Sequence, residues 1–429
     1  MRECASMYMY IYFLFIRLAA LFGHKKAKLL VEGQKQMANI QMPKSAIWIH
    51  TASVGEFEQA RPLIEKLRAL QPQQKIVVTF FSPSGYEARK NFRDVNGIYY
   101  LPFATRRNAR RFLDALQPRM AIFVKYEFWP AYLRELKKRS IPTYSISAIF
   151  RPKQLFFWPW GKLHLQLLKC FTHIYVQDED SLDLLAKYGI TQATVAGDTR
   201  FDRVHTVMEN GLNTTDERLN LVEQFVNGSD RVIVAGSTWP KDEELLAKYI
   251  RQLSKFDLSN NRVPAGLRTI NYQLSTKLIL VPHELDEEHL HTIFQLFQGR
   301  FVRLSEATPV TMLHASVLVV DTMGILSRIY RYGQVAYIGG GFGVGIHNTI
   351  EAAVYGMPVI FGPNYRHFRE AKGLINAGAA RSISNYAELA AALDTALDNH
   401  ASIGAKAAAY ITSELGATEK IYINIFKQQ

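Results

Sequence analysis

The stretch from Gln334 to Pro363 constrains the fold more than any other part of the chain. An apolar run, Val335 to Ile338, precedes five glycines within the seven residues 339–345. Asn348 and Glu351 then have the spacing of a capping box at the start of a helix. This order of strand, glycine loop and helix is typical of a parallel α/β sheet, in which ligands bind at the carboxyl ends of the strands. The alternative interpretation is a tight turn in which Glu351 only caps the helix.

Apolar runs of strand length alternate with helical patterns along the whole chain. The runs begin at Ile47, Lys75, Ile98, Met120, Pro142, His173, Ala193, Arg231, Lys277, Val317 and Val335. Such alternation predicts an α/β fold with two Rossmann-like, doubly wound domains that face each other across a cleft. Asn210 to Asp216 is the expected linker, and Asn260 to Tyr272 is expected to be a surface insertion. After a strand that Pro358 opens, only helices are expected.

The net charge of +13 is concentrated in the first half of the chain. Residues 1–210 hold 31 Lys and Arg against 17 Asp and Glu, whereas residues 211–429 hold 20 against 21. A basic half indicates an anionic partner: nucleic acid, acidic lipid or an acidic substrate. A non-catalytic nucleic-acid-binding protein is the less favoured alternative, because the aromatic residues crowd the first 22 residues and the strands instead of alternating with Lys and Arg.

The N-terminal segment Met7 to Phe22 is apolar except for Arg17, and three lysines follow it between residues 25 and 28. A membrane span needs about 20 residues, so this segment is short for one. A helix on an anionic membrane surface, a short span, and a first helix packed on the domain all remain open. Cys4 and Cys170 have neither metal-ligand spacing nor a disulfide framework, which indicates a reducing compartment, and no secretory signal is evident.

Ser53, Gly55 and Glu56 follow the first expected strand, at the edge where an α/β sheet presents reactive groups. Gly55 is expected to allow a sharp turn, and Glu56 to lie at or just before the next helix. A carboxylate there can accept the proton of a substrate hydroxyl, as a general base does. It can equally be a helix-start acid favoured by the helix dipole, and position alone does not separate the two.

A second carboxylate, Glu127, lies at another strand-to-helix junction. Lys125 beside it offers a positive charge, and Pro130 is expected to open the helix. Glu127 can orient an acceptor or stabilise developing charge, and a helix-start role is the competing interpretation.

Four arginines between residues 106 and 111 form two pairs, each one helical turn apart. Such a cluster is usually a solvated face, and phosphate binding is the second interpretation because it lies in the basic half. His50, His173 and His347 are single histidines without partners at metal-ligand spacing, so they are expected to make polar or core contacts and no metal site is predicted.

These motifs occur together in one known family. The sequence resembles the 3-deoxy-D-manno-octulosonic acid (Kdo) transferases of lipopolysaccharide biosynthesis, which have the two-domain GT-B glycosyltransferase fold. The matching segments extend over nearly the whole chain and include Trp48–Glu56, Glu127–Pro130, Gly197–Asp202, Ala235–Thr238, Asp321–Gly324 and Asn348–Glu351. The first two segments together are specific, whereas the glycine loop is shared with many glycosyltransferases.

The resemblance implies an inverting glycosyltransferase, a lipid IVA Kdo transferase, that transfers Kdo from CMP-Kdo to a lipid A precursor at the cytoplasmic face of the inner membrane. It implies no metal and no other cofactor, an anionic membrane surface as partner, and no nucleic acid. Another GT-B enzyme that uses a UDP-sugar on a lipid or glycan acceptor is the nearest alternative.

Four parts of the chain are expected on this basis. They are an apolar membrane-associated segment, 1–22; an acceptor domain, 23–210; a CMP-Kdo-binding domain, 217–415; and a C-terminal helix, 416–429, that packs back on the acceptor domain.

The resemblance also implies roles for single residues. Glu56 matches the general base, and Glu127 matches an acidic residue of the acceptor side. The expected CMP-binding residues are Pro282, His283, Met323, Gly324, Ile325, Asn348, Thr349, Ile350 and Glu351, with Glu351 on the ribose. The expected acceptor and phosphate contacts, which follow from the loop and charge arguments above, are Ser53, Gly55, Arg106, Arg107 and Arg110.

Three positions depart from the family pattern. The chain has Pro282-His283-Glu284 where the family commonly has Pro-Arg-His, so a phosphate-facing arginine is missing there. It has Ile325 and Lys125 where the family commonly has acids. These departures bear on the nucleotide contacts and on the number of Kdo units transferred more than on the reaction type.

Overall fold

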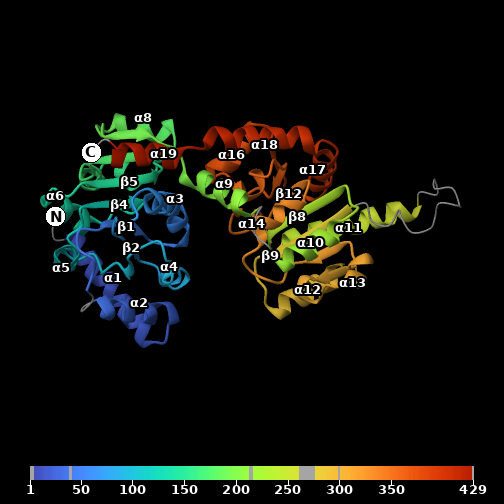
Figure 1. Cartoon of the computed structure of the whole chain (residues 1–429), viewed down its shortest axis with the longest axis horizontal. Helices are drawn as coiled ribbons and strands as arrows, with labels where there is room; N and C mark the ends of the chain where they lie inside the picture. The colour runs from blue at the N-terminus through green and yellow to red at the C-terminus, as the bar shows by residue number, and fades with distance from the viewer. Residues whose placement is uncertain (1–3, 38–40, 212–215, 260–275, 298–299, 428–429) are drawn as a thin grey trace. The chain divides into compact units, whose positions relative to one another are not determined.

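The computed structural model describes residues 4–37, 41–211, 216–259, 276–297 and 300–427 (Figure 1). The chain divides into two compact units. Unit 1 comprises Met1–Arg203 and Glu414–Gln429, and unit 2 comprises Val204–Ser413. The whole of the expected surface insertion, Asn260 to Tyr272, and the centre of the expected linker lie outside the described residues.

Unit 1 is built on a parallel seven-stranded sheet in the order β3-β2-β1-β4-β5-β6-β7. The apolar runs of β1, β2 and β4 are buried along their whole length, as expected of strands covered by helices on both faces. The strands are β1 Ile47–Thr51, β2 Ile76–Phe80, β3 Gly97–Tyr100, β4 Met120–Val124, β5 Thr143–Ala148, β6 His173–Val176 and β7 Ala193–Val195.

The helices of unit 1 connect these strands and precede or follow the sheet. They are α1 Cys4–Leu21, α2 Lys25–Gln36, α3 Val54–Leu70, α4 Pro83–Arg89, α5 Arg106–Leu116, α6 Pro130–Lys138, α7 Lys162–Leu168, α8 Glu179–Lys187 and α19 Ala417–Tyr422, with 3-10 turns at Leu155–Phe157 and a π-helical turn at Ile423–Lys427. The boundary between the units falls within α9 (Thr199–Gly211).

Unit 2 repeats the scheme with a second parallel seven-stranded sheet, in the order β10-β11-β9-β8-β12-β13-β14. Its strands are β8 Arg231–Thr238, β9 Thr276–Pro282, β10 Phe301–Arg303, β11 Val317–Val319, β12 Val335–Ile338, β13 Val359–Phe361 and β14 Ala380–Ser382. Its helices are α10 Glu217–Val226, α11 Pro240–Ser259, α12 Glu287–Phe297, α13 Pro309–Leu313, α14 Leu326–Ile329, α15 Ile350–Ala353, α16 Arg369–Asn376, α17 Tyr386–Asp398 and α18 His400–Glu414, with 3-10 turns at Leu304–Glu306 and Tyr330–Tyr332.

The predicted α/β class with two doubly wound sheets is confirmed. The expectation that only helices follow β13 was wrong, because β14 adds an edge strand. β10 on the opposite edge was also missed. Both are three residues long and only partly buried, so neither gives an apolar run that a sequence pattern can detect.

In each sheet the chain first adds strands on one side of its first strand and then crosses to the other side, which makes a switch point beside the first strand. In unit 1 this switch point lies between β1 and β4, and in unit 2 it lies between β8 and β12. The connections that leave the two strands of a switch point run to opposite faces of the sheet. The opening between them at the carboxyl ends is where open α/β sheets bind ligands.

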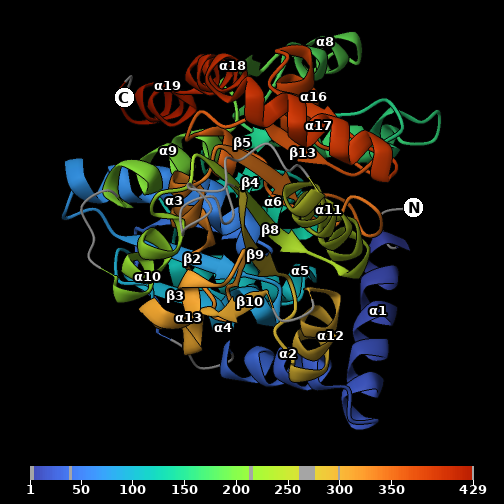
Figure 2. The same ribbon diagram turned by 90° about the vertical axis from the view of Figure 1, so that its right-hand side faces the viewer.

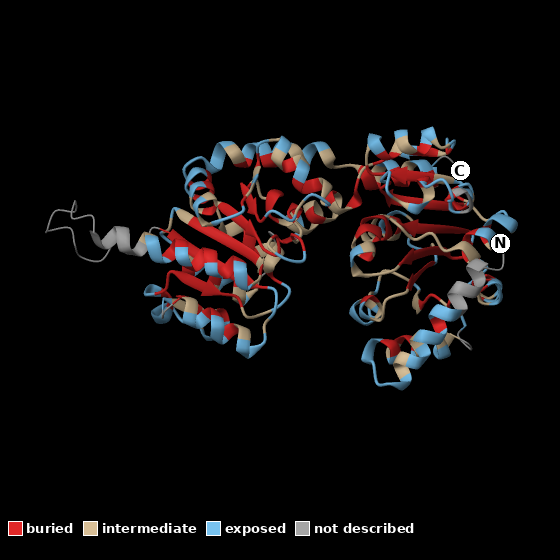
Figure 3. Ribbon diagram, turned by 180° about the vertical axis from the view of Figure 1, so that it is seen from behind, coloured by how far each residue is buried: buried red, intermediate tan, exposed pale blue. Residues whose placement is uncertain are grey.

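The strands carry the core of each unit, and the outer faces of the helices are exposed (Figure 3). The C-terminal segment belongs to the core of unit 1, because Ile421, Tyr422 and Ile425 pack into one apolar cluster with the inner face of α3. Asp202 fixes the start of this segment, since its carboxylate accepts hydrogen bonds from the backbone N–H groups of Gly416 and Thr418, both at 2.7 Å.

Helix α1 lies on the outside of unit 1, next to α2 (Figure 2). Phe13 is buried and stacks on Phe103, with ring centroids 3.6 Å apart, and Ile16 joins the same small cluster. Leu14, Phe15 and Leu18 on the remaining surface are exposed. No helix among the described residues is long and apolar enough to cross a membrane.

Candidate functional site

The loop after β1 presents Ser53 and Glu56 at the switch point of unit 1. Ser53 is the N-cap residue of α3, and its hydroxyl bonds the Glu56 carboxylate in place of a backbone N–H. Glu56 lies in the first turn of α3 and is partly exposed. The structure therefore leaves both interpretations of Glu56 standing: a carboxylate at a helix start, and a base within reach of a ligand.

Gly55 has a different role from the one expected. It lies inside the first turn of α3 and is absent from the residues with positive φ, so no sharp turn requires a glycine there. A Cβ at this position would meet only the Ser53 hydroxyl, at an ordinary 3.7 Å. What the glycine leaves is open surface directly beside Glu56.

The loop after β4 places Glu127 on the other side of the switch point. Its Oε2 atom accepts a hydrogen bond from the indole N–H of Trp129 at 2.6 Å and lies 3.2 Å from Nε2 of His50. Pro130 opens α6 as expected, and the N-cap residue Trp129 makes no side-chain cap bond. Glu127 therefore does not cap α6, and the helix-start interpretation of this residue was wrong.

Lys125, which stands where the family commonly has an acid, opens this loop in the left-handed region, with φ of 61°. Its backbone N–H bonds the carbonyl of Ile146 on β5. Ser147 on β5 and Ser237 on β8 also have positive φ, of 51° and 54°. Non-glycine residues in this region cost about 1–3 kcal/mol each and gather at binding and catalytic loops.

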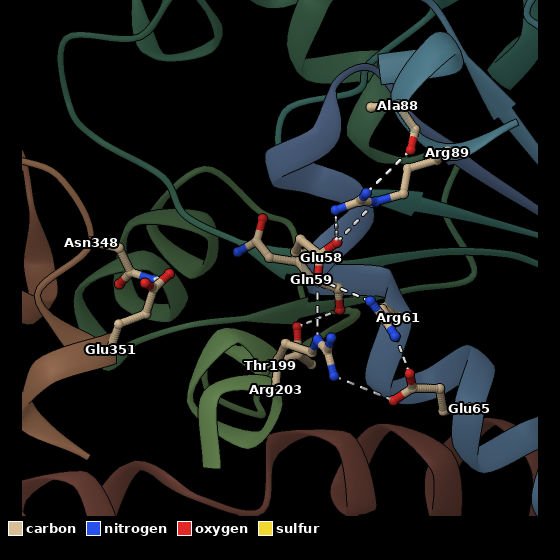
Figure 4. A network of polar contacts seen from close by, with 10 residues as sticks. All are labelled: Glu58, Gln59, Arg61, Glu65, Ala88, Arg89, Thr199, Arg203, Asn348 and Glu351. Carbon is tan, nitrogen blue, oxygen red and sulfur yellow. Dashed lines mark hydrogen bonds and ion pairs between the residues drawn. The ribbon is translucent and has the colours of Figure 1, made fainter. Parts of the chain in front are cut away.

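A network of charged side chains holds the helix that carries Glu56 (Figure 4). The Glu58 carboxylate accepts hydrogen bonds from Arg89 of α4 at 2.8 Å and from Arg203 of α9 at 3.1 Å. Thr199 adds a hydroxyl bond to the carbonyl of Gln59 at 2.6 Å. Three helices are thus tied together within three residues of Glu56, which fixes the first turn of α3.

The arginine cluster lies on α5, which follows β3 in the same sheet. Arg106, Arg107, Arg110 and Arg111 are all exposed, and Thr105 caps the helix start through its side chain. Arg106 and Arg107 in the first turn lie at the carboxyl edge of the sheet, two strands from β1. Arg110 is turned toward Glu135 of α6, at 3.5 Å. The first two arginines are therefore the better placed for a phosphate at this edge.

At the switch point of unit 2, three aromatic rings from three loops pack against one another. His283 follows β9 and stacks on Trp239, with ring centroids 4.8 Å apart, and the His347 ring contacts both, with its centroid 4.5 Å from that of His283. The indole N–H of Trp239 donates to Nε2 of His347 at 3.2 Å, so in the neutral ring Nδ1 carries the proton. Burial and the neighbouring His283 both hold the pKa of His347 below its usual range.

Asp242, buried beneath this stack, ties two loops together. Its carboxylate accepts hydrogen bonds from the backbone N–H groups of Trp239 at 3.0 Å and Gly340 at 2.9 Å, and from the Tyr337 hydroxyl at 2.6 Å. Burial raises the pKa of Asp242, and these three donors oppose the shift. Asp242 thus fixes the glycine loop against the loop that follows β8.

The glycine loop is shaped by backbone packing more than by a ligand. A Cβ on Gly339 would lie 2.2 Å from the carbonyl oxygen of Ser237, and one on Gly341 would lie 2.6 Å from the backbone of Gly362. Gly340 has φ of 87°. Backbone packing therefore accounts for Gly339 and Gly341 and a positive φ for Gly340, whereas Gly343 borders open space.

The expected CMP-binding residues fall into two groups. Side chains of Ile325, Thr349 and Ile350 are fully buried, so these residues can offer only backbone atoms to a ligand. The buried Ile325 also explains how an apolar residue replaces the acid common at this position. The expected contacts that remain at or near the surface are His283, Met323, Gly324, Asn348 and Glu351, whereas Pro282 ends β9 and is buried.

Asn348 and Glu351 bond each other instead of forming the expected capping box. The Asn348 side-chain amide donates to Glu351 Oε1 at 2.9 Å, and its oxygen accepts from the backbone N–H of Ile350 at 3.1 Å (Figure 4). The N-cap position of α15 is Thr349, which makes no side-chain cap bond.

One cluster of possible metal ligands occurs among the described residues: Glu284, Asp286 and His289. Both ring nitrogens of His289 are already engaged, Nδ1 with the carbonyl of Glu284 at 3.1 Å and Nε2 with Glu243 at 2.8 Å. Asp286 accepts from the backbone N–H of His289 at the start of α12. The cluster is explained by these contacts.

Three contributors were missed in the sequence. Trp239 lies in the loop after β8 and Asp242 in the first turn of α11, and no motif marks an indole or a carboxylate there for a role. His50 was read as a polar or core contact, and its partner Glu127 is 77 positions away in the chain. Only the strand pairing brings such residues together.

Comparison with known proteins agrees with this fold. Residues 21–203 match the family profile described as 3-deoxy-D-manno-octulosonic-acid transferase (kdotransferase). The 3-deoxy-D-manno-octulosonic acid transferase of Aquifex aeolicus is 26% identical over 81% of this chain and 84% of its own length. The enzyme of the same name from Haemophilus influenzae is 29% identical over 76% of this chain and 73% of its own.

Solved structures show the fold alone. UDP-GlcNAc 2-epimerase from Neisseria meningitidis, bound to UDP-GlcNAc, aligns with a TM-score of 0.62 at 15% identity, over 90% of this chain and 100% of that one. A putative UDP-N-acetylglucosamine 2-epimerase from Listeria monocytogenes aligns with a TM-score of 0.61 at 14% identity, over 90% and 98%. Both support a two-domain α/β fold of the GT-B type.

The fold, the carboxylates at its switch point and the sequence matches define the chain as a glycosyltransferase. Within that class, the sequence matches support a 3-deoxy-D-manno-octulosonic acid (Kdo) transferase.

The aromatic stack predicts a pH effect at His347. Since burial and His283 lower its pKa below the ordinary 6.5, the unfolded chain binds this proton more readily than the folded chain. The free energy of unfolding of unit 2 should therefore fall as the pH is lowered below about 6.5. The His283→Gln variant removes one of the two causes, so the pKa of His347 should rise.

Histidine NMR titration of the wild type and of His283→Gln measures this shift. His173 in unit 1 is the internal control, because burial alone lowers its pKa and the substitution should not move it. An unchanged His347 in the variant would show that the two rings do not interact.

Proposed function

We propose that the chain is an inverting glycosyltransferase that transfers Kdo from CMP-Kdo to a lipid A precursor, lipid IVA, in lipopolysaccharide biosynthesis. The observation that carries this proposal is the pair of carboxylates, Glu56 and Glu127, at the switch point of unit 1 in a chain that matches the Kdo transferase family profile. The two units divide the binding: unit 1 takes the acceptor, and unit 2 takes the nucleotide of the donor.

Glu56 is the proposed general base. Its carboxylate accepts the proton of the acceptor hydroxyl as the hydroxyl oxygen forms a bond to the anomeric carbon of Kdo. The bond from that carbon to the CMP phosphate breaks, and the phosphate oxygen keeps the electron pair. Attack on the face opposite the leaving group inverts the configuration. The open surface that Gly55 leaves beside Glu56 suits the approach of a sugar hydroxyl.

The donor nucleotide is proposed to bind at the carboxyl edge of unit 2. His283 stands where the family commonly has a phosphate-facing arginine, and its exposed ring offers an N–H to a phosphate oxygen. Glu351 is proposed to bond the ribose, with Asn348 holding its other oxygen. Gly324 borders open space and leaves room for the base. CMP leaves as a phosphomonoester, which such donors stabilise without a metal.

The acceptor carries phosphates, and unit 1 contains the surplus of positive charge. Arg106 and Arg107 are exposed at the same sheet edge as Glu56. Arg110 lies one helical turn further along α5 and pairs with the Glu135 carboxylate, at 3.5 Å. Arginine forms paired hydrogen bonds to phosphate oxygens, so the first two are the proposed phosphate contacts.

Mass spectrometry of the product tests the proposed reaction. The purified protein with CMP-Kdo and a tetraacylated lipid A precursor should give a lipid heavier by one or more Kdo units, and CMP should be released. The same reaction with UDP-sugars is the control for the donor. Transfer from a UDP-sugar and none from CMP-Kdo would overturn the donor assignment and favour the alternative GT-B activity.

Replacing the proposed base should abolish turnover but not nucleotide binding. In Glu56→Gln we expect kcat to fall by roughly 10²–10⁴-fold, which is the usual contribution of general base catalysis. The affinity for CMP should stay within error of the wild type. Glu87→Gln, an exposed carboxylate on α4, is the matched control and should keep full activity. Wild-type kcat in Glu56→Gln would refute the base assignment.

We further propose that α1 attaches the enzyme to an anionic membrane surface at the cytoplasmic face of the inner membrane. The exposed apolar side chains are Ile11, Leu14, Phe15, Leu18, Leu21 and Phe22. Exposed Lys25, Lys26 and Lys28 follow directly. Apolar side chains beside lysines are typical of a helix that lies in the headgroup region of an acidic bilayer.

Removing three of these side chains tests the attachment. In Leu14→Ser/Phe15→Ser/Leu18→Ser we expect binding to vesicles that contain phosphatidylglycerol to weaken by roughly tenfold or more, because each buried side chain of this kind contributes about 1.5–3 kcal/mol. The control is Val310→Ser/Leu313→Ser, which removes equally exposed apolar side chains from unit 2. Equal sedimentation of the two variants with vesicles would contradict a role for α1.

A further inference from the structure

We propose that His50 is a positioning residue that holds one proton against Glu127 and thereby keeps the Glu127 carboxylate charged and oriented for the acceptor. The expected effect on acceptor binding rests on the proposed function. The contact between His50 and Glu127 does not depend on it. The sequence predicts only a polar or core contact for His50, so the positioning role is new.

The proton count begins at Nδ1 of His50. This atom lies 3.1 Å from the backbone carbonyl oxygen of Thr79 and 2.9 Å from its hydroxyl oxygen. The Thr79 hydroxyl oxygen accepts from the indole N–H of Trp48 at 2.8 Å, so its own hydrogen can be donated to Nδ1. In the neutral ring the hydrogen then lies on Nε2.

The other ring nitrogen faces a carboxylate. Nε2 of His50 lies 3.2 Å from Oε2 of Glu127, and neither atom can bond the other unless a hydrogen lies between them. The same Oε2 accepts from Trp129 at 2.6 Å, and a second donor favours the ionised carboxylate. The arrangement is therefore an imidazole whose Nε2–H donates to a charged Glu127.

Burial makes this hydrogen bond costly to lose. His50 is fully buried, and the Glu127 side chain is 13% exposed. The other rings around the imidazole, Trp48, Phe123 and Trp129, are uncharged. A buried N–H enclosed by such rings needs an acceptor, and Glu127 is the acceptor that the described residues provide.

The pairing leaves one oxygen of Glu127 for a ligand. Oε2 is engaged by two N–H groups, whereas no partner of Oε1 is found among the residues that the structure describes. A carboxylate fixed in this way is suited to accept a hydrogen bond from a hydroxyl of the acceptor. It is less suited to take up a proton, which separates its role from that of Glu56.

Strand pairing builds this arrangement from three neighbouring strands. His50 on β1 pairs with Thr79 on β2 and with Phe123 on β4, four residues before Glu127. His50 also lies three residues before Ser53. The imidazole of His50 thus connects the loop after β1 with the loop after β4.

The protonation state can be measured without any substrate. NMR of protein labelled with ¹⁵N-histidine, with His50 assigned by its loss in His50→Gln, should show Nε2 protonated and Nδ1 unprotonated at neutral pH. In Glu127→Leu, which removes the acceptor, this tautomer should no longer be favoured. An unprotonated Nε2 in the wild type, or a ring unchanged in Glu127→Leu, would overturn the proposal even if Kdo transfer is confirmed.

The functional consequence has its own readout. In His50→Leu the KM for the lipid acceptor should rise roughly tenfold or more, the loss that corresponds to one charge-assisted hydrogen bond, with the affinity for CMP unchanged. His50→Gln keeps an N–H donor toward Oε2 and should restore part of this loss. His173→Gln, on β6 of the same sheet, is the matched control and should behave as wild type.

If His50 had a purely structural role, the two variants would rank in the opposite order of activity. A buried apolar site tolerates leucine better than glutamine, so His50→Leu would then be the more active variant. If His50→Gln does not fold, Trp129→Phe tests the same geometry, because loss of the second donor should also raise the acceptor KM. No change in the acceptor KM in either variant would refute the positioning role. If the NMR result holds but no transfer occurs, the proposed function fails and the proton pairing stands.

Discussion

The switch point in each parallel sheet is the constraint on which the rest of the structure depends. At such a point neighbouring connections leave the sheet toward opposite faces, and the carboxyl ends of two strands are left uncovered. In unit 1 these strands are β1 and β4, and in unit 2 they are β8 and β12. The loops that carry Glu56, Glu127, Trp239 and the glycines follow these four strands.

A buried polar side chain stabilises each switch point. It is a carboxylate in unit 2, and in unit 1 it is a histidine that contacts a carboxylate. In unit 2, Asp242 accepts hydrogen bonds from two loops and from Tyr337 of β12, and it fixes the glycine loop. In unit 1, His50 plays the corresponding part from beneath Glu127. Buried polar groups of this kind are costly unless every member is paired, so they define one geometry of the loops above them. That geometry is what a binding site for a charged substrate requires.

The sequence predicts the sheets well because their strands are continuous apolar runs, as at Ile47–Thr51 and Val335–Ile338. It fails at β14, which is too short and polar to give such a run. At Gly339 the sequence does not show that the backbone of Ser237 excludes a side chain, and at Gly55 a side chain would fit, so neither role can be predicted from the residue type alone. The partners of Glu127 could not be predicted, because they depend on strand register.

The division of binding between the two units is the central claim, and calorimetric titration of CMP tests it most directly. Substitutions at the switch point of unit 1, Glu56→Gln and Glu127→Gln, should leave the Kd for CMP unchanged. Substitutions in unit 2, His283→Ala and Glu351→Ala, should raise it by roughly tenfold or more, the loss of one charged hydrogen bond. Loss of CMP binding in the unit 1 variants, with wild-type binding in those of unit 2, would contradict the account.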